Sequence, residues 1–591
     1  MKRFGAPQMP HNIQIIPKNR KKTAHQMALN LALIFIIPIS FSLPSFLTQA
    51  LPNQASNGID HWCSKTPHPE PCKISLGGPR RRVPIGEADF RTMMVEAALE
   101  RALHAEIHVN ELRRRCRSKR KLAAWLDCSG LISNTVFQLN NTLQGLKATS
   151  ANVNWTDADC QTWLSTALTN LGTCLAGSHQ LNVSNFISPV VSNNVSELIS
   201  NGLAINGALL DGQETKGEFP SWVSAGERKL LESPSTLSSQ ANFIVAQDGS
   251  GHYRSIQAAI NFAVSRRRRD ERITIHVKRG VYREYIEINK NMNKITLVGD
   301  GMRHTIISGK RSVASGYTIY SCATVGSPLR FKWGQPMKSG IATRNYFEML
   351  SLICSGYGLS GIDGAGFMAR GITFRNRAGP QNGQAVAVRS ASDFSVFYAC
   401  GFEGYQDTLL VLAQRQFFKI CYIYGTIDFI FGNAAVVFQS CIIYVRKPLW
   451  GQANVITAQG RVDPNQNTGI SIQGSQVLAA PGFARVFRYY NTYLGRPWQR
   501  YSRTVFLQSY LGSLVNPAGW LAWENTDFAQ DTLYFGEYKN FGPASSTTRR
   551  VNWKGHHVIT SAGTASQFTV ANLIAGNTWL PATGVPFTAG L

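Results

Sequence analysis

A short repeat in the C-terminal half restricts the fold more than any other feature of this sequence. The pattern Phe-x-x-Cys occurs at residues 397–400, 418–421 and 438–441, at almost equal intervals. After residue 241, short runs of β-branched and aromatic residues alternate with Gly and Asn, and almost no helical pattern follows 256–265. A period of about 21 residues without intervening helices predicts an all-β parallel β-helix, whose coils stack about 4.8 Å apart.

Side chains one period apart lie on the same face of such a solenoid. Gln384, Gln406 and Asp428 are equally spaced in the sequence, and Asp407 follows Gln406 directly. We therefore expect Gln384, Gln406 and Asp428 to form a column, with Asp407 beside it. Arg496 follows further along the chain, in a Leu-Gly-Arg-Pro-Trp segment. The alternative is that both carboxylates are ordinary turn residues.

This set of side chains predicts chemistry at an ester. Two adjacent carboxylates cannot comfortably both ionise, so Asp428 beside Arg496 would stay anionic as a nucleophile, and Asp407 would keep its proton and donate it. The amides of Gln384 and Gln406 offer the N–H donors that an oxyanion requires. Retaining glycoside hydrolysis also uses paired carboxylates, but N–H donors do not stabilise its positive oxocarbenium centre.

Nearby aromatic residues and the motifs that the sequence lacks limit the possible reactions further. We expect aromatic side chains to surround this set, namely Tyr405, Phe429, Phe431 and Trp498. The chain has no G-x-S-x-G nucleophile elbow, no H-E-x-x-H and no Cys/His pair at zinc spacing. Serine-nucleophile and zinc chemistry therefore find no support in the sequence.

The charge of the chain favours an anionic partner. Residues 232–591 contain 36 basic and 18 acidic residues, a net charge of +18. A basic globular unit suits nucleic acid, acidic lipid or acidic polysaccharide. Nucleic acid is the poorer candidate, because the N-terminus directs this surface out of the cytoplasm.

The N-terminus has the pattern of a secretory leader. Residues 27–47 are an uncharged apolar run preceded by basic residues at 18–22. Residues 1–50 are therefore predicted to be a signal peptide or signal anchor, the only membrane contact that we expect. Four N-x-S/T sequons follow, at Asn140, Asn154, Asn182 and Asn194, and they indicate a secreted, glycosylated segment.

The segment between the leader and the β-rich half is predicted to be helical. Trp163, Leu164, Ala167, Leu168 and Leu171 recur at helical spacing. We assign 55–212 to a helical domain and 213–240 to a linker rich in Gly, Pro and Ser. The linker contains a dibasic site for a processing protease at residues 228–231, which are Arg228, Lys229, Leu230 and Leu231.

Five segments together resemble plant pectin methylesterases (pectinesterases). They are residues 280–284 (GVYRE), 384–389 (QAVAVR), 405–409 (YQDTL), 428–433 (DFIFGN) and 494–498 (LGRPW). The resemblance covers about 241–591, and residues 60–210 resemble pectin methylesterase inhibitors. It implies a right-handed parallel β-helix after an all-α four-helix bundle, and hydrolysis of methyl esters of polygalacturonate in pectin to pectate and methanol.

The resemblance also implies roles for individual residues. Asp428 would be the nucleophile and Asp407 the proton donor, with Gln384 and Gln406 as the oxyanion hole and Arg496 holding Asp428. Four side chains would contact the sugar, namely Phe431, Trp498, Gln384 and Arg496. The implied partners are methyl-esterified pectin, a processing protease and an inhibitor protein, and no metal or cofactor is implied. The implied location is the cell wall, reached by secretion, with the helical pro-region keeping the enzyme silent until export.

Eleven cysteines leave at least one thiol unpaired. By the resemblance, Cys63 and Cys72 correspond to the first disulfide of the inhibitor family, and Cys128 and Cys174 are candidates for a second bridge in its later helices. Cys400 and Cys421 form a third candidate pair, because stacked coils bring their Cα atoms to about 5 Å.

One segment departs from the family pattern. Residues 327–361 separate two parts that are almost continuous in the relatives, and they show no strand alternation. They are either an unremoved intron or wrongly assigned exon, or a tolerated loop. If the insertion disables the β-helix, the chain would instead be a non-catalytic wall-binding or inhibitor-type protein. A third alternative is another β-helix polysaccharide enzyme, a lyase or glycosidase.

Overall fold

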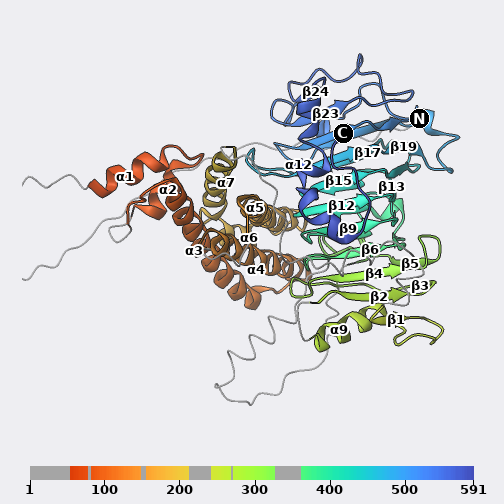
Figure 1. The fold of residues 1–591 in the computed structure, drawn as a ribbon, viewed down its shortest axis with the longest axis horizontal. Helices are drawn as coiled ribbons and strands as arrows, with labels where there is room; N and C mark the ends of the chain where they lie inside the picture. Colours follow the sequence, from red (N-terminus) through yellow and green to blue (C-terminus); the bar gives the residue numbers. More distant parts are fainter. Residues whose placement is uncertain (1–53, 78–81, 148–154, 212–240, 268–270, 326–360) are drawn as a thin grey trace, which may run out of the picture. The chain divides into compact units, whose positions relative to one another are not determined.

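The computed structural model describes residues 54–77, 82–147, 155–211, 241–267, 271–325 and 361–591 (Figure 1). Four predicted features lie outside these residues: the leader within 1–50, the linker 213–240 with its protease site at 228–231, nearly all of the insertion 327–361, and the sequon at Asn154. Within the described ranges, no helix is both long and apolar enough to cross a membrane.

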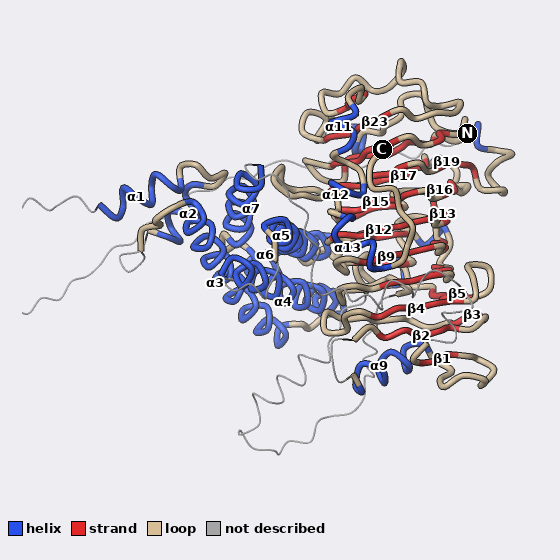
Figure 2. Tube along the Cα trace, in the orientation of Figure 1, coloured by secondary structure: helices blue, strands red, loops and turns tan. Residues whose placement is uncertain are grey.

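The first part of the described chain is helical, as predicted (Figure 2). Its helices are α1 (Gln54–Cys63), α2 (Pro69–Leu76), α3 (Glu87–Leu112), α4 (Lys119–Lys147), α5 (Asp157–Gln180), α6 (Ser184–Val191) and α7 (Val195–Asp211). The four long helices pack in a closed ring, α3 on α4, α4 on α5, α5 on α7 and α7 on α3. This arrangement is a four-helix bundle.

Local sequence signals explain where α5 begins and which face it buries. The Thr156 hydroxyl accepts a hydrogen bond from the Asp159 N–H, and the Asp159 carboxylate accepts one from the Thr156 N–H, which completes a capping box. Trp163, Leu164 and Leu171 are buried, so the predicted apolar face is confirmed.

Two disulfides stabilise this bundle. Cys63 and Cys72 join α1 to α2, and Cys128 and Cys174 join α4 to α5, with Cα atoms 5.6 Å and 4.7 Å apart. Both pairs were predicted from the sequence and are confirmed. The second bridge closes a loop of 46 residues and the first a loop of only 9, so the second restricts the unfolded chain more strongly than the first.

The second part of the described chain is a solenoid of three parallel sheets (Figure 1). Sheet A contains β1 (Phe243–Val245), β2 (Ile273–Val277), β4 (Ile295–Gly299), β6 (Met368–Arg370), β9 (Ser395–Tyr398), β12 (Arg415–Lys419), β15 (Ala435–Gln439), β18 (Gly469–Gln473), β21 (Arg503–Leu507), β23 (Tyr534–Tyr538) and β24 (His556–Val558). Sheet B contains β3 (Gly280–Tyr282), β5 (Thr305–Gly309), β7 (Thr373–Asn376), β10 (Gly401–Glu403), β13 (Tyr422–Gly425), β16 (Ile442–Val445), β19 (Gln476–Ala479) and β22 (Tyr510–Leu511). Sheet C contains β8 (Val388–Ser390), β11 (Leu409–Val411), β14 (Ile430–Gly432), β17 (Asn454–Gln459) and β20 (Thr492–Pro497).

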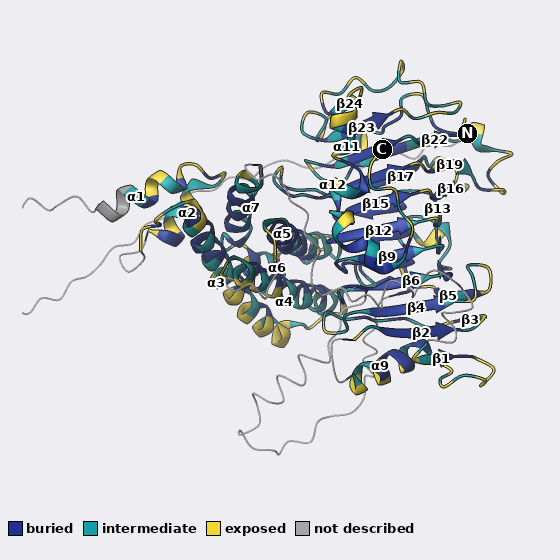
Figure 3. Cartoon of the chain, viewed as in Figure 1, coloured by how far each residue is buried: buried dark blue, intermediate teal, exposed yellow. Residues whose placement is uncertain are grey.

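The predicted repeat forms the interior of this solenoid. Phe397, Phe418 and Phe438 pair in register on β9, β12 and β15, and successive rings stack with centroids 4.6 Å apart. This spacing matches the separation of neighbouring strands, so each coil adds one ring to a continuous column. The parallel β-helix predicted from the period is confirmed, and its strands are mostly buried (Figure 3).

The cysteines of the same repeat are not bonded to one another. Cys400, Cys421 and Cys441 are all buried and all free, so the expected Cys400–Cys421 bridge is wrong. The thiol of Cys400 donates to the carbonyl of Tyr398 (3.5 Å), and that of Cys421 donates to the carbonyl of Phe397 (3.2 Å). Stacking brings the backbones close, but a bridge also needs sulfur atoms directed at each other, and here each faces a carbonyl.

Short helices cover parts of the solenoid. At its N-terminal end, α9 (Ile256–Arg266) buries Ile256 and Ile260 against the first strands. The Glu284 carboxylate, from the GVYRE segment, accepts hydrogen bonds from the first N–H groups of this helix. Near the C-terminus, α11 (Ala562–Ser566), α12 (Val570–Leu573) and α13 (Gly576–Trp579) follow the last strand, and α12 and α13 pack on sheet A through Val570 and Trp579.

Candidate active site

The two carboxylates lie on one edge of the solenoid, where sheet B turns into sheet C. Asp407 lies between β10 and β11, and Asp428 lies between β13 and β14 on the next coil. Both have left-handed backbone angles, with φ of 58° and 49°. This conformation is unusual for a residue other than glycine, and it recurs here at the equivalent turn position of two successive coils.

The backbone register corrects one detail of the predicted column. The N–H of Asp407 donates to the carbonyl of Ile427 (2.9 Å), and the N–H of Ala385 donates to the carbonyl of Gln406 (3.1 Å). Asp407 is therefore level with Asp428, and Gln406 is level with Gln384 one coil earlier. The equal sequence spacing placed Gln406 beside Asp428, but the pairs Glu403–Tyr424 and Leu409–Ile430 show that this coil is one residue shorter than that spacing.

Arg496 on β20 holds Asp428 from two strands away in sheet C. Its Nε donates to one carboxylate oxygen of Asp428 (2.9 Å) and its Nη2 donates to the other (2.5 Å). The guanidinium also lies over the ring of Trp523, 4.5 Å from the centroid. A bidentate pair with a stacked guanidinium fixes the carboxylate in one orientation.

The environment separates the two carboxylates in acidity. Burial raises the pKa of Asp407 well above its usual range, the charge of Asp428 raises it further, and Arg496 lowers it. Burial also raises the pKa of Asp428, but the hydrogen bonds and charge of Arg496 oppose that rise. Asp428 therefore loses its proton first, and Asp407 remains the protonated member of the pair.

The four aromatic residues expected around this pair differ in their positions. Phe431 on β14 contacts Trp498 edge to face, with centroids 5.9 Å apart. Tyr405 is partly exposed and precedes Gln406 in the same turn. Phe429 was expected to belong to this group but is fully buried in the core inside the solenoid. Neighbouring residues of an extended chain point to opposite faces, so Phe429 can be next to Asp428 in the sequence and still point into the core.

The helical bundle contacts the solenoid next to the site through polar groups of α5. The Nε2 of Gln466 donates to the carbonyl of Ser165 (2.9 Å), and the Nδ2 of Asn433 donates to the hydroxyl of Thr169 (2.9 Å). Asp159 forms an ion pair with Arg415 (2.7 Å). Sequence reasoning missed this interface.

The residues of α5 at that interface are mostly polar. The same helix buries a series of polar side chains, namely Gln161, Thr162, Ser165, Thr166, Thr169 and Asn170. In the sequence these residues form the polar face of an amphipathic helix, which is the usual pattern of a helix exposed to solvent. Their burial, and with it the interface, is visible only in the structure.

Several residues of the resembling segments support the site without belonging to it. Arg389 is fully buried and pairs with both oxygens of Asp363 (2.8 Å and 3.0 Å). Asn433 accepts hydrogen bonds at its side-chain oxygen from Gln459 (2.9 Å) and Thr468 (2.5 Å). These contacts connect neighbouring coils, so the segments position turns as well as supply reacting groups.

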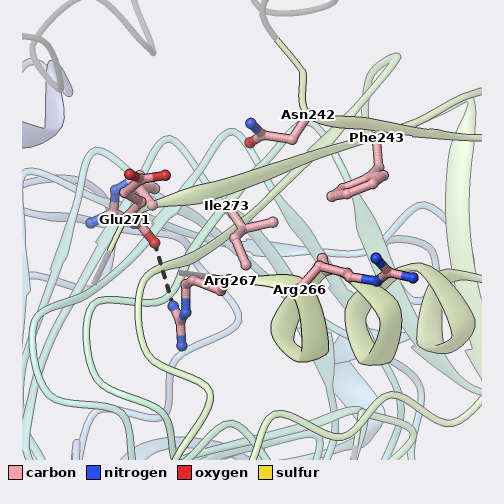
Figure 4. A pocket seen from close by; sticks show the side chains of 8 residues that line it. Asn242, Phe243, Arg266, Arg267, Glu271 and Ile273 are labelled. Atoms are coloured by element: carbon pink, nitrogen blue, oxygen red, sulfur yellow. Dashed lines mark hydrogen bonds between the residues drawn. The ribbon is translucent and has the colours of Figure 1, made fainter. Parts of the chain in front are cut away.

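A cavity of about 530 Å³ lies between α9 and the first strands of the solenoid, β1 and β2, and Figure 4 shows the side chains that line it. It is lined by Asn242, Phe243, Ala263, Arg266, Arg267, Glu271, Arg272 and Ile273. Arg267 donates to the backbone carbonyl of Glu271 there (3.4 Å). None of these residues comes from the turns with the two aspartates. Within the described residues, no cluster of three or more His, Cys, Asp or Glu side chains could hold a metal ion.

Two family models match this chain. The pectinesterase family matches residues 242–331 and 357–577, and the plant invertase/pectin methylesterase inhibitor family matches residues 57–205. The pectinesterase match is interrupted between 331 and 357, inside the segment that departs from the family pattern.

Two similar proteins align with nearly the whole chain, and a solved structure aligns with part of it. The chain is 51% identical to probable pectinesterase/pectinesterase inhibitor 33 of Arabidopsis thaliana, over 91% of this chain and 86% of that protein. It is 46% identical to pectinesterase 2 of Citrus sinensis, over 95% of this chain and 100% of that protein. The solved structure of pectin methylesterase from carrot covers 59% of this chain and 98% of its own, at 45% identity and a TM-score of 0.52. The chain therefore belongs to the pectinesterase family, with an N-terminal domain of the pectin methylesterase inhibitor family.

Proposed function

We propose that this chain hydrolyses the methyl esters of polygalacturonate in pectin and releases pectate and methanol. The observation that carries the proposal is the bidentate Arg496–Asp428 pair with Asp407 at the equivalent position of the preceding coil. A clamped anionic carboxylate next to a protonated one supplies both a nucleophile and an acid.

The first half-reaction forms an acyl-enzyme. A carboxylate oxygen of Asp428 attacks the carbonyl carbon of the methyl ester, and the negative charge moves to the carbonyl oxygen. The side-chain N–H groups of Gln384 and Gln406, which are level with each other on adjacent coils, stabilise that oxyanion. Asp407 gives its proton to the departing methoxy oxygen, so methanol leaves and an anhydride to Asp428 remains.

The second half-reaction restores the enzyme. Asp407, now ionised, takes a proton from water, and the resulting hydroxide attacks the carbonyl carbon of the anhydride. The bond to Asp428 breaks, the galacturonate is released as an acid, and Asp407 is again protonated. Arg496 stabilises Asp428 as the leaving carboxylate, because its two hydrogen bonds favour the charged form.

The strand register on either side of the insertion argues against the alternative in which the insertion disables the catalytic domain. Val325 pairs with Val388, and Ile362 pairs with Ser390, so both ends of the insertion lie in one row beside β8. The chain leaves this row after Val325 and re-enters it at Ile362, with the coil complete. A solenoid accepts an excursion at such a position without losing its stack.

We also propose that the chain is secreted, processed and active in the cell wall. The apolar run at 27–47, the sequons and the two disulfides of the bundle support an oxidising, extracellular destination. A net charge of +18 in residues 232–591 supports retention by acidic polysaccharide. Cleavage at 228–231 by a protease would separate the bundle, whose α5 contacts the region of the site, and a separate inhibitor protein would take the same place.

The test is methanol release from highly esterified pectin by the secreted chain, before and after proteolysis of the linker. Asp428→Asn keeps the size of the side chain but removes the nucleophile, so release should fall to background. Asp531→Asn, at an exposed carboxylate, is the matched control and should behave as wild type. Equal rates for Asp428→Asn and wild type would overturn the mechanism, and shortening of the polymer would identify a lyase or glycosidase instead.

A further inference from the structure

A row of residues beyond β20 lies directly beside Arg496. Residues 517–523 follow β22 and pass along β20, where Gly495 and Trp520 pair as a parallel bridge. The N–H of Leu521 donates to the carbonyl of Gly495 (3.0 Å), so these residues add one row to sheet C. Gly495 directly precedes Arg496 in the chain, and the row therefore bounds the residue that clamps the nucleophile.

The same row ends in the ring that supports the Arg496 guanidinium. That guanidinium lies 4.5 Å from the ring centroid of Trp523, which begins a tight turn, Trp523–Asn525. The next two residues, Glu524 and Asn525, both have left-handed backbone angles, with φ of 50° and 58°. Such angles are costly outside glycine and persist only where the surrounding structure fixes them. The position of Trp523 therefore depends on how firmly residues 517–523 are held.

A buried polar network holds this row in place. The indole Nε1 of Trp520 donates to the Glu537 carboxylate on β23 (3.2 Å). Arg550 donates to both oxygens of the same carboxylate (2.8 Å and 3.0 Å) and, through Nη1, to the carbonyl of Pro517 (3.0 Å). The side chains of Glu537 and Arg550 are each only 2% exposed, and Nε2 of His556 on β24 lies 3.4 Å from the carboxylate. The network therefore contacts the row at Pro517 and again at Trp520.

The Trp520 ring connects this network to the strand that carries Arg496. It stacks on Phe535 with centroids 4.2 Å apart and is almost fully buried. A side chain at Gly495 would place its first carbon 3.0 Å from the ring, so the ring and the backbone of this glycine leave no space between them. Because the interior is closely packed, a shift of the ring would move Gly495 and, with it, Arg496.

Stability alone is a weak reason for a charged pair at this place. Burial by itself raises the pKa of Glu537, but the hydrogen bonds and charges of His556 and Arg550 oppose it and hold the pKa below its usual value, so the carboxylate is ionised. A buried ion pair gains little over apolar residues of the same volume, because both ions lose their water. Apolar residues could not supply the directional bonds to Trp520 and Pro517.

We propose that the buried pair of Glu537 and Arg550 positions the active site for ester hydrolysis. Through Trp520 and the row that follows it, the pair fixes the direction in which Arg496 holds Asp428. Neither residue of the pair touches the reacting atoms, so both are positioning residues. The inference rests on the proposed function, because it gives them a role in the attack by Asp428.

Loosening the network should have the same kind of effect as weakening the Arg496 clamp. A guanidinium that is free to turn stabilises the charged form of Asp428 less well, so the pKa of Asp428, which burial already raises, would rise further. Attack requires the ionised carboxylate, so kcat should fall and the acid limb of the pH–rate profile should move to higher pH. A merely structural role would lower the melting temperature and leave this limb in place.

The test is methanol release across pH by the full secreted chain after proteolysis of its linker. Trp520→Phe keeps the stacked ring but removes the donor to Glu537, so it should lower kcat about 3- to 10-fold and displace the acid limb. Trp579→Phe is the matched control, because the buried indole of Trp579, in α13 on sheet A, donates to the carbonyl of Ile574 (2.8 Å). This variant also loses one buried hydrogen bond, but its kcat should stay within about twofold of wild type with the limb in place.

A second variant and a double variant make the test specific. Arg550→Lys keeps a charge beside Glu537 but cannot make all the hydrogen bonds to it and to Pro517, so it should displace the acid limb in the same direction. In the Arg496→Lys background, where the clamp is already weak, Trp520→Phe should lower kcat by less than about twofold.

Two results would overturn the inference. One is an acid limb that Trp520→Phe and Arg550→Lys leave where Trp579→Phe leaves it. The other is an equal loss of kcat from Trp520→Phe in the wild-type and Arg496→Lys backgrounds, because a residue that acts through Arg496 cannot act fully without it. The wild type is measured in parallel. If it releases methanol while the limb stays fixed in the variants, only the positioning role is refuted; if it releases none, the proposed function itself is refuted.

Discussion

Replacement of Arg496 by lysine tests the central relation in this site, the control of Asp428 by its guanidinium. The substitution keeps a positive charge but can make only one of the two hydrogen bonds to Asp428, and it loses the flat contact with Trp523. A hydrogen bond to a charged group contributes about 1.5–3 kcal/mol. Because the clamp orients and stabilises the attacking carboxylate, kcat should fall roughly 10- to 150-fold.

The pH dependence provides the more diagnostic result. Burial raises the pKa of Asp428 and Arg496 opposes this, so a weaker clamp lets the pKa of Asp428 rise further. Attack requires ionised Asp428, so the acid limb of the pH–rate profile should move to higher pH. Arg496 also lowers the pKa of Asp407, so the alkaline limb, which reports loss of the Asp407 proton, should move the same way.

The assay is the initial rate of methanol release across pH, resolved into kcat and KM. Arg375→Lys is the matched control, because Arg375 pairs with Glu403 through one contact (2.5 Å) on a partly exposed surface. Exposed pairs contribute at most about 1 kcal/mol, so this variant should keep the wild-type profile. A kcat within about twofold of wild type for Arg496→Lys, with neither limb displaced, would refute the reasoning.

Four further predictions concern the stability of the fold and the effect of the insertion. Phe418→Ala removes the central ring of the interior column and should lower the free energy of unfolding by about 3–5 kcal/mol. Urea denaturation measures this change, and an unchanged midpoint would contradict the stacked core. Replacement of both Cys128 and Cys174 by serine opens a 46-residue loop and should lower the free energy of unfolding by about 4 kcal/mol. Thermal unfolding followed by circular dichroism measures this loss, and an unaltered helical transition would show that the bridge adds little. Deletion of 326–360 should preserve folding and methanol release, because both ends of the insertion lie in one row beside β8; loss of secretion would argue against that register. Burial raises the pKa of Asp127 to about 7, so between pH ~4 and 7 the folded chain holds a proton that the unfolded chain has released. The melting temperature should therefore fall as pH rises toward 7. Asp127→Asn should flatten this pH dependence, and an identical slope in the variant would contradict the prediction.

The sequence alone determined the features that depend on periodicity. A Phe-x-x-Cys repeat at almost equal intervals predicted stacked coils, and Phe397, Phe418 and Phe438 do stack at 4.6 Å. The helical spacing within α5 predicted its buried face in the same way. Such patterns are readable because a regular element places every residue by its position in the repeat.

Tertiary structure decided the contacts between segments that no period relates. Arg496 lies 68 residues after Asp428, and only the stacking of sheet C brings its guanidinium to both carboxylate oxygens. The polar contacts of α5 with Gln466 and Asn433 depend on packing in the same way. The thiols of Cys400 and Cys421 show the converse, because backbone proximity was predictable but the directions of the sulfur atoms were not. Periodicity fixes which face a side chain occupies, whereas its partner depends on the geometry of all the coils and helices that pack around it.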